Sequence, residues 1–233
     1  MLTLLTTTGC RPDAWKLCQR WMAAQTYTGP VRWVVVDDGE IPQAIEFSRA
    51  GWDMQVIRPD RLWKPGMNTQ ATNLLAGLKV IGRADRLVII EDDDHYGPDW
   101  LGVVDEELDQ ADLVGETKAR YYNVATRQYR QLNNLNHASL CATAMKGRGI
   151  ELLMRCSVPG VQFIDMSLWK QSVERSLFKG HRVVGIKGMP GRDGIGMGHR
   201  PGPGWAVDHD GAVLASWVGD EAVYYEGFRH DLG

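Results

Sequence analysis

Three short apolar runs, each ending in polar or acidic residues, constrain the fold of this chain most strongly. They cover residues 2–7, 31–38 and 86–94. Short β-branched runs of this kind are typical of parallel strands that are buried on both faces. Helical patterns lie between them. The order of strand, helix, strand, helix and strand predicts an α/β fold in which helices flank a mostly parallel sheet.

Three helices are predicted around these strands. Pro12 suits a first helical turn, and apolar residues at positions i, i+3, i+4 and i+7 follow within residues 12–24. Asn68 or Thr69 can cap a second helix, whose apolar residues again fall on one face. Pro98 can start a third helix soon after the acidic residues that end the third run.

The pattern changes after about residue 115. Residues 119–132 alternate around a turn-like centre, which predicts a hairpin, and residues 146–156 and 165–179 show helical patterns. Residues 185–204 contain eight glycines and three prolines and are predicted to form a long loop without regular structure. Long loops in compact domains are usually functional or disordered.

The length of the chain predicts one domain, residues 1–233, with an α/β half (1–115) and a more irregular half (116–233) laid across the strand ends. The four cysteines form no CxxC pair, so reduced thiols in a cytoplasmic protein are expected. The N-terminus lacks a basic region, and no run reaches the roughly 18 apolar residues of a membrane span. No signal peptide and no membrane contact are therefore expected.

The third apolar run leads directly into four consecutive acidic residues, Glu91 to Asp94. In an open parallel sheet, ligands bind beyond the carboxyl ends of the strands, where this cluster would meet Asp37 and Asp38. Adjacent carboxylates repel one another and raise their own pKa values unless a cation lies among them. The sequence therefore predicts a Mg²⁺ or Mn²⁺ ion, held by carboxylates and by substrate phosphates.

Alternation of side chains along a strand would direct Asp92 and Asp94 to one side and Asp93 to the other. The cluster can then hold a metal and also bond a sugar or ribose hydroxyl. The alternative is a solvated acidic turn in which one aspartate caps the helix at Pro98. A cap needs one carboxylate, whereas this turn supplies four.

Four segments of the sequence resemble the nucleotide-sugar glycosyltransferases of the GT-A fold, most closely those of family 2. They are LLTTTGCRPDAWKLCQRWMAAQTY, WVVVDDG, IIEDDDHYGPDWL and VQFIDMSLWKQ, and they span about residues 2–170. The resemblance implies a Rossmann-like sheet in which residues 1–115 bind a nucleotide-sugar and residues 116–233 bind the acceptor. A UDP-sugar is the favoured donor.

The resemblance also implies roles for residues of the first half. Thr8 and Arg11 are expected near the nucleotide, and Asp37 and Asp38 are expected to bind the base and the ribose. Lys64 is expected to meet the donor phosphates, with a solvated loop lysine as the alternative.

The third segment resembles the metal-binding D-x-D motif of the family. Two registers are open, Asp92-x-Asp94 and Glu91-x-Asp93. Asp94 is predicted to be a metal ligand, with Asp92 and Asp93 directed toward the donor sugar and its ribose.

Two further roles fall in the second half of the chain. Proteins of this fold often add a histidine as metal ligand, for which His199 is the first candidate and His209 the second; a surface loop residue is the alternative for His199. The fourth segment carries the catalytic base in the family, which implies this role for Asp165. Ile164 stands where the family usually has an acid. The alternative for Asp165 is a helix N-cap.

The implied mechanism is a metal-dependent, inverting transfer. The metal neutralises the leaving diphosphate, while Asp165 removes the proton of the acceptor hydroxyl. Lys187 and Arg192, in the glycine-rich loop, are predicted to close over the diphosphate and exclude water.

The charge of the second half bears on the acceptor. Residues 116–200 contain 14 Lys and Arg against 5 Asp and Glu, with aromatic residues interleaved. Basic groups bind phosphates, aromatic rings stack on bases, and an enzyme that acts on a base usually flips it. The favoured acceptor is therefore a hydroxymethylated pyrimidine in DNA, as for phage-encoded DNA-modifying enzymes that act in the host cytoplasm. The alternative is a soluble enzyme acting on a saccharide or a small metabolite.

Two other classes of protein stay open. A nucleotidyltransferase on a related fold would carry a loop like G-x-G-T-R after the first strand, where this chain has Thr6-Thr7-Thr8-Gly9-Cys10. A non-catalytic module that binds a nucleotide-sugar or DNA would show no turnover at all.

Overall fold

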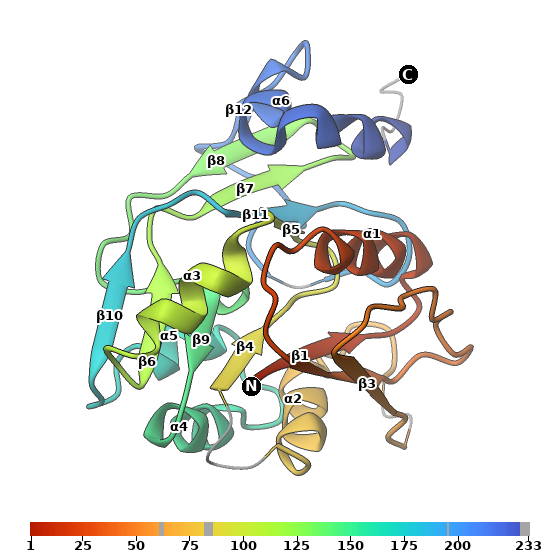
Figure 1. Cartoon of the computed structure of the whole chain (residues 1–233). Helices are drawn as coiled ribbons and strands as arrows, with labels where there is room; N and C mark the ends of the chain where they lie inside the picture. The colour runs from red at the N-terminus through yellow and green to blue at the C-terminus, as the bar shows by residue number, and fades with distance from the viewer. Residues whose placement is uncertain (61–62, 82–85, 195, 229–233) are drawn as a thin grey trace.

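The computed structural model describes residues 1–60, 63–81, 86–194 and 196–228, which form two β-sheets with helices around the larger one (Figure 1). The strands in these residues are β1 (Leu2–Thr8), β2 (Val31–Asp37), β3 (Trp52–Ile57), β4 (Arg86–Ile89), β5 (His95–Tyr96), β6 (Leu113–Glu116), β7 (Arg120–Asn123), β8 (Gln128–Gln131), β9 (Thr143–Met145), β10 (Arg175–Phe178), β11 (Val183–Lys187) and β12 (Ala206–Val207). The helices are α1 (Pro12–Ala23), α2 (Gln70–Leu78), α3 (Trp100–Glu107), α4 (Arg148–Cys156), α5 (Ile164–Leu168) and α6 (Ala212–Val218), with 3-10 helices η1 (Leu140–Ala142) and η2 (Gly219–Phe228).

Among the described residues, the larger sheet has seven strands in the order β10-β6-β9-β4-β1-β2-β3. β1 pairs in parallel with β2 and β4, β2 pairs in parallel with β3, and β6 pairs in parallel with β10. β9 pairs antiparallel with both of its neighbours. The prediction of an α/β fold with a mostly parallel sheet flanked by helices is confirmed.

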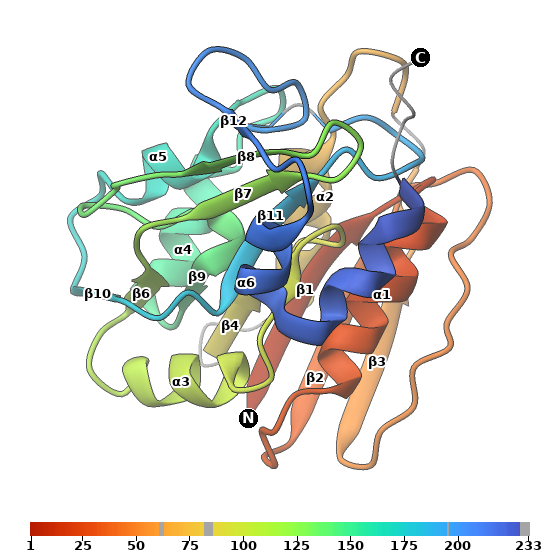
Figure 2. The same cartoon turned by 90° about the horizontal axis from the view of Figure 1, so that it is seen from above.

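Helices cover both faces of this sheet, as its apolar strands require. Leu4 of β1 packs with residues of α1 and α3, whereas Leu5 packs with residues of α2 and α4. Val35 and Val36 of β2 divide between the two cores in the same way. Figure 2 shows α1 and α3 in front of the sheet and α2 and α4 behind it. Burial on two sides explains why the strands are continuous apolar runs.

A smaller sheet, in the order β12-β8-β7-β11-β5, lies above the larger one in Figure 1. Its β7–β8 pair is antiparallel, which confirms the predicted hairpin over residues 119–132. β5 follows the acidic cluster directly and pairs antiparallel with β11. This pairing holds the late strand β11 beside the edge of the larger sheet at which the acidic residues lie.

The three helices predicted in the first half are present. α1 begins at Pro12, as expected, and α3 begins at Trp100, two residues after Pro98. The Asn68 side chain accepts the N–H of Gln70, the first residue of α2, at 2.9 Å. Thr69 occupies the N-cap position of α2 without such a bond, so Asn68 supplies the hydrogen bond expected of a cap.

Two predictions for the second half are wrong in part. Helix α5 ends at Leu168, and Arg175–Phe178 forms β10 instead of continuing a helix over 165–179. β10 pairs with β6, so hydrogen bonding at the edge of the sheet outweighs the helical pattern of this segment. The predicted loop 185–204 begins late, because its first residues end β11; residues 188–194 and 196–204 contain no helix or strand, and residue 195 lies outside the described residues.

Strand β3 was not predicted from the sequence. It pairs with β2 at the edge of the larger sheet, and all its residues are at least partly exposed. The four cysteines are free, in keeping with the expectation of reduced thiols. Among the described residues, no helix combines the length and the apolar character that a membrane span needs.

Two helical glycines provide a matched test of the packing around α4. A Cβ atom added at Gly149 would lie 2.3 Å from the Asp112 carbonyl oxygen, whereas one added at Gly102 of α3 would meet no atom within 4 Å. We expect Gly149→Ala to lower the free energy of unfolding by about 1–3 kcal/mol, because the added methyl group would overlap the Asp112 carbonyl oxygen. Gly102→Ala should raise it by about 0.5–1 kcal/mol. Chemical denaturation measures both, and equal values would contradict the close approach of α4.

Candidate functional site

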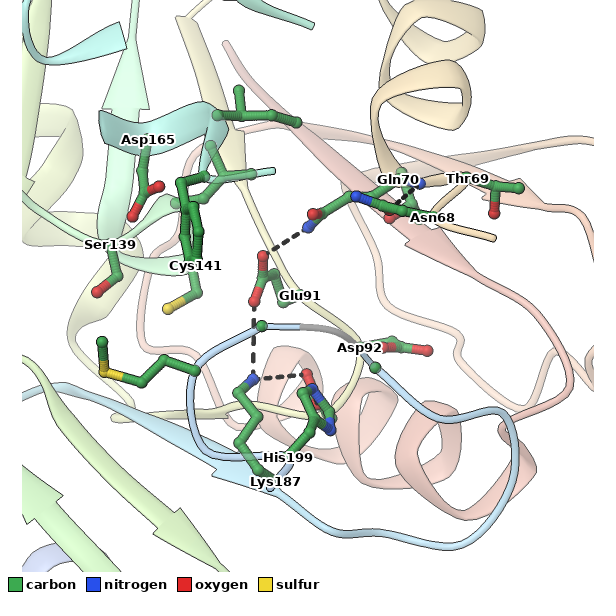
Figure 3. Close-up of a pocket in the computed structure, with 18 of the residues that line it drawn as sticks. Asn68, Thr69, Gln70, Glu91, Asp92, Ser139, Cys141, Asp165, Lys187 and His199 are labelled. Atoms are coloured by element: carbon green, nitrogen blue, oxygen red, sulfur yellow. Dashed lines mark hydrogen bonds and ion pairs between the residues drawn. The ribbon is translucent and has the colours of Figure 1, made fainter. Parts of the chain in front are cut away.

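A cavity of about 240 Å³ lies beyond the carboxyl ends of β1 and β4. Its wall includes Thr8 at the end of β1, Glu91 after β4 and Asp165 of α5. Figure 3 shows Asp165 on one side of the cavity and Lys187 and His199 on the other, with Glu91 between them. Both halves of the chain therefore contribute to one site at the ligand-binding edge of the sheet.

Arg11 binds two acids of the cluster. Its guanidinium lies 2.6 Å from Asp92 Oδ1 and 2.7 Å from Asp93 Oδ2, and Thr8 donates a hydrogen bond of 2.7 Å to Asp92 Oδ2. Burial would lower the pKa of Arg11, but the charges of Asp92 and Asp93 reverse this effect and raise it. Arg11, Thr8, Asp92 and Asp93 all line the cavity. Arg11 is therefore a permanent positive charge at the start of α1.

Lys187, the last residue of β11, lies among three acids. Its Nζ is 2.6 Å from Asp94 Oδ1, 3.2 Å from Asp93 Oδ1 and 3.8 Å from Glu91 Oε2. Burial alone would lower the pKa of Lys187, but the nearby carboxylates raise this pKa well above the usual value. For Asp93, the two cations overcome burial and hold the pKa below its usual range. The contact between Lys187 and Asp93 is thus ionic, whereas burial raises the pKa values of Asp94 and Glu91 against the opposing charge of Lys187.

The acidic residues do not alternate as predicted. β4 ends at Ile89, so residues 91–94 form a turn rather than a strand. Asp92 and Asp93 share Arg11, and Asp93 and Asp94 share Lys187. Asp94 is fully buried and does not line the cavity, so its side chain faces the protein interior.

His199 lines the cavity but, among the described residues, it pairs with Asp93 instead of Asp94. Its Nε2 lies 3.7 Å from Asp93 Oδ2. Burial, then the charge of Lys187, lowers the pKa of His199 to about 4, so the ring is neutral at pH 7. His209 is exposed and lies outside the cavity; its carbonyl oxygen accepts a hydrogen bond from Arg127.

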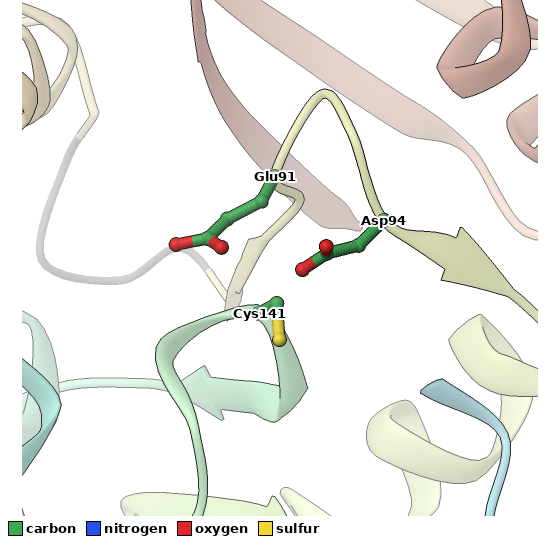
Figure 4. Close-up of side chains that lie close together, drawn as sticks. All are labelled: Glu91, Asp94 and Cys141. Carbon is green, nitrogen blue, oxygen red and sulfur yellow. The ribbon is translucent and has the colours of Figure 1, made fainter. Parts of the chain in front are cut away.

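A hard divalent cation does not fit the carboxylates as the chain arranges them. Asp94 Oδ1 already accepts hydrogen bonds from Lys187 and from the Ile186 N–H. Figure 4 shows three possible ligand atoms, which are one oxygen of Glu91, one oxygen of Asp94 and the sulfur of Cys141. These three atoms lie within 4.8 Å of one another. Burial, followed by the Asp94 charge, raises the pKa of Cys141 well above the usual value, so its sulfur keeps its proton. Mg²⁺ and Mn²⁺ prefer oxygen ligands and do not suit such a set.

Two aspartates at the end of β2 hold neighbouring loops: Asp37 is the last residue of the strand and Asp38 follows it. Asp37 accepts hydrogen bonds from the N–H groups of Gly39 and Gln43 and pairs with Arg58 at 2.8 Å. Asp38 accepts a 2.7 Å hydrogen bond from Thr69 and pairs with Arg192 at 2.6 Å. Hydrogen bonding to Arg192, Asn73 and Thr69 outweighs burial and lowers the pKa of Asp38. Neither aspartate lines the cavity itself.

Asp38 nevertheless acts on the cavity through its partners, because Thr69 and Arg192 both line it. Arg192 also lies over the Trp63 ring, 5.3 Å from its centroid. The Arg192 N–H donates to the Cys10 carbonyl at 3.0 Å, so the glycine-rich loop is docked on the turn between β1 and α1. Lys64, by contrast, is exposed and lies outside the cavity.

Asp165 is the second residue of α5, and the N-cap position belongs to Phe163. The cap role considered for Asp165 is therefore wrong in position. Burial raises the pKa of Asp165, and nearby backbone N–H groups and His137 oppose the rise only in part. Phe163 has a left-handed φ of 59° and is 57% exposed at the mouth of the cavity.

Several cavity residues carry no motif that could have identified them. Gln70 donates a 2.8 Å hydrogen bond to Glu91 from the first turn of α2. Trp63, Ser139 and Cys141 also line the cavity. Their places follow from contacts between distant segments, and the only signal in the sequence was the cap pattern around Asn68.

Lys187 and Arg192 line the cavity, but most of the basic residues of the second half do not gather there. The hairpin carries three of them, α4 and the residue before its N-cap carry three, and the segments around β10 carry four. Among the described residues, the following line no part of the cavity: Arg120, Arg127, Arg130, Lys146, Arg148, Arg155, Lys170, Arg175, Lys179, Arg182 and Arg200. Figure 1 places the hairpin in the upper part of the molecule, beneath α6, and α4 at the bottom. The charge argument for DNA loses its support.

No protein-family model matches the sequence, and no curated protein matches it either. The structure is similar to that of S. aureus TarS, with a TM-score of 0.52 at 13% identity over 79% of this chain and 36% of TarS. The crystal structure of S. aureus TarS 1-349 gives a TM-score of 0.52 at 13% identity over 80% of this chain and 60% of that one. This chain thus spans less than two thirds of either TarS chain. The likeness establishes that the two proteins share a fold.

Proposed function

We propose that the chain is a glycosyltransferase that moves a sugar from a nucleoside-diphosphate sugar to an acceptor hydroxyl. One observation carries the proposal: a single cavity has a cationic and acidic cluster on one wall and Asp165 on the other. Transfer of a sugar needs positive charge for the leaving diphosphate and a base for the acceptor proton. Lys187, Arg11 and Arg192 suit the first need, and Asp165 suits the second.

The proposed donor is a UDP-sugar. TarS, whose fold the chain shares, has been crystallised with UDP-GlcNAc and with UDP. In this chain Trp63 offers an aromatic face for the base, and α2 directs its N-terminal end, which is favourable for phosphate, toward the cavity. Arg192, held by Asp38 and close to Trp63, is available to the diphosphate.

The proposed chemistry is a direct displacement. Asp165 takes the proton of the acceptor hydroxyl as the acceptor oxygen bonds to the anomeric carbon. The bond from that carbon to the diphosphate breaks, and its electron pair stays on the leaving oxygen. Attack from the side opposite the leaving group inverts the anomeric configuration. A raised pKa makes Asp165 a stronger base than an ordinary aspartate.

The proposed acceptor is an uncharged saccharide or small metabolite. The basic residues that favoured a hydroxymethylated pyrimidine in DNA lie outside the cavity, and the exposed Phe163 at its mouth suits a sugar ring or another flat apolar surface. The acceptor test uses purified protein, a panel of UDP-sugars, free saccharides and hydroxymethyl-pyrimidine DNA, with products weighed by mass spectrometry. Transfer to a saccharide supports this acceptor, and transfer to DNA alone rejects it. Absence of any transfer would favour a non-catalytic module.

Replacement of the proposed base is the first test of the mechanism. Asp165→Asn should lower kcat by about 10²–10⁴-fold and leave the Kd for UDP unchanged, because the base acts only in the chemical step. Asp193→Asn, at an exposed carboxylate of the same cavity, is the matched control and should retain activity. Equal losses in the two variants would reject Asp165 as the base.

The pH dependence of the reaction gives a second test. A base must be deprotonated to act, so kcat/KM should fall as the pH falls through the pKa of Asp165. Burial raises that pKa above the ordinary aspartate value of about 3.9. The acid limb should therefore lie above this value in the unaltered protein and should be missing from the residual activity of Asp165→Asn. A variant profile with the same limb would assign it to another group.

Stacking of the donor base is tested at Trp63. Trp63→Ala should raise the Kd for UDP about 5- to 150-fold, which corresponds to the roughly 1–3 kcal/mol of one stacked base. Trp217→Ala is the control, since Trp217 packs on Tyr129 outside the cavity. Isothermal titration calorimetry measures both affinities, and an unchanged Kd for Trp63→Ala would exclude this ring as the base platform.

A further inference from the structure

The acidic turn contains a cation that belongs to the chain itself. Lys187 is 4% exposed, and its ammonium lies within 4 Å of carboxylate oxygens from Glu91, Asp93 and Asp94. An acidic turn that serves a divalent ion would leave its oxygens facing an open position. Here the position among the three acids is filled by Nζ, which also borders the cavity.

Backbone pairing fixes this lysine in place. β5 follows Asp94 directly, and its His95 and Tyr96 pair with Val184 and Val183 of β11. The Ile186 N–H, on the same strand, donates a 2.9 Å hydrogen bond to Asp94 Oδ1. The strand that ends in Lys187 is therefore tied to the acidic turn by its pairing with β5 and by a main-chain N–H that donates to the Asp94 side chain. The ammonium is a built-in part of the site, unlike the charge of a long side chain on a free loop.

The charges of the turn are shared between two cations. Arg11 contacts Asp92 and Asp93, and Lys187 contacts Asp93 and Asp94. Each aspartate thus has a cationic partner at 3.2 Å or less. A divalent ion bound to Asp93 and Asp94 would compete with Lys187 for Oδ1 of both residues. Asp94 Oδ2 is buried and has no hydrogen-bond partner among the described residues, but an ion there would still be repelled by the Lys187 charge. Nothing in this arrangement requires such an ion.

We propose that Lys187 takes the place of a divalent metal in this site and supplies the positive charge that faces the leaving diphosphate of the donor. The second part rests on the proposed function; the first part, exclusion of the metal, does not. During transfer, the electron pair of the broken bond to the anomeric carbon stays on the diphosphate oxygen, and Nζ stabilises the resulting negative charge. The proton of the acceptor goes to Asp165, so no further reactant is needed.

Metal binding by the protein without substrate tests the exclusion directly. Electron paramagnetic resonance of added Mn²⁺ should show free ion in the presence of the unaltered protein. Lys187→Ala and Lys187→Met remove the ammonium and leave the four acids with Arg11 alone, so both variants should bind Mn²⁺ and should gain thermal stability with it. Lys187→Arg should behave like the unaltered protein, and so should Lys170→Ala, at an exposed lysine outside the cavity.

Mn²⁺ binding to the unaltered protein tests the exclusion of metal even if variants at residue 187 fail to fold. Tight binding of one Mn²⁺ that Asp93→Asn abolishes would overturn the inference. Free Mn²⁺ in the presence of UDP as well as in its absence would support it, because substrate phosphates can complete a metal site.

Transfer assays then test whether Lys187 stabilises the leaving diphosphate of the donor. EDTA should leave the rate of the unaltered enzyme unchanged, whereas Lys187→Ala should lower kcat by about 10²–10³-fold, with a smaller change in KM, as expected when one charge-stabilising donor is removed. Added Mn²⁺ should restore part of this loss. Activity that EDTA abolishes in the unaltered enzyme, and that Mn²⁺ restores, would overturn the inference. Absence of transfer from every donor would remove the proposed function, while the Mn²⁺ binding result would still decide whether Lys187 excludes the metal.

Discussion

Adjacent carboxylates that are buried together stay ionised only if positive charge is buried with them. This requirement shapes the chain around Glu91–Asp94. Arg11 reaches the turn from the start of α1, and Lys187 reaches it from the end of β11. The two cations thereby tie segments next to both sheets to the acidic turn. The cavity, the docked glycine-rich loop and the second sheet all lie around this charged cluster.

Local patterns were sufficient to predict most of the first half of the fold. β1, β2 and β4 are continuous apolar runs because two cores cover them, and such runs are visible in any single sequence. Residues 165–179 show the limit of this reasoning. Their pattern suits a helix, but Arg175–Phe178 completes the edge of the sheet beside β6, and a strand at that edge depends on a partner far away in the sequence.

The sequence predicted the location of the site better than it predicted the side chains that form it. Thr8, Arg11, Asp92 and Asp93 line the cavity, in keeping with the rule that strand ends meet at one edge. Asp165 and His199 line it as well, as the family resemblance led us to expect. The following predicted residues lie outside it: Asp37, Asp38, Lys64 and Asp94. Side-chain directions in a turn do not follow strand alternation, and the contacts of Lys187 join residues that no local pattern connects.

The contacts around the acidic turn also span long distances along the chain. The bond from Arg11 to Asp92 crosses 81 residues, and the bond from Lys187 to Asp94 crosses 93. During synthesis on the ribosome, the four acids emerge long before β11 does. Until Lys187 arrives, a partly folded chain would have to keep the acidic turn in water. Closure of the ligand-binding edge is therefore completed only after the chain has been synthesised through Lys187.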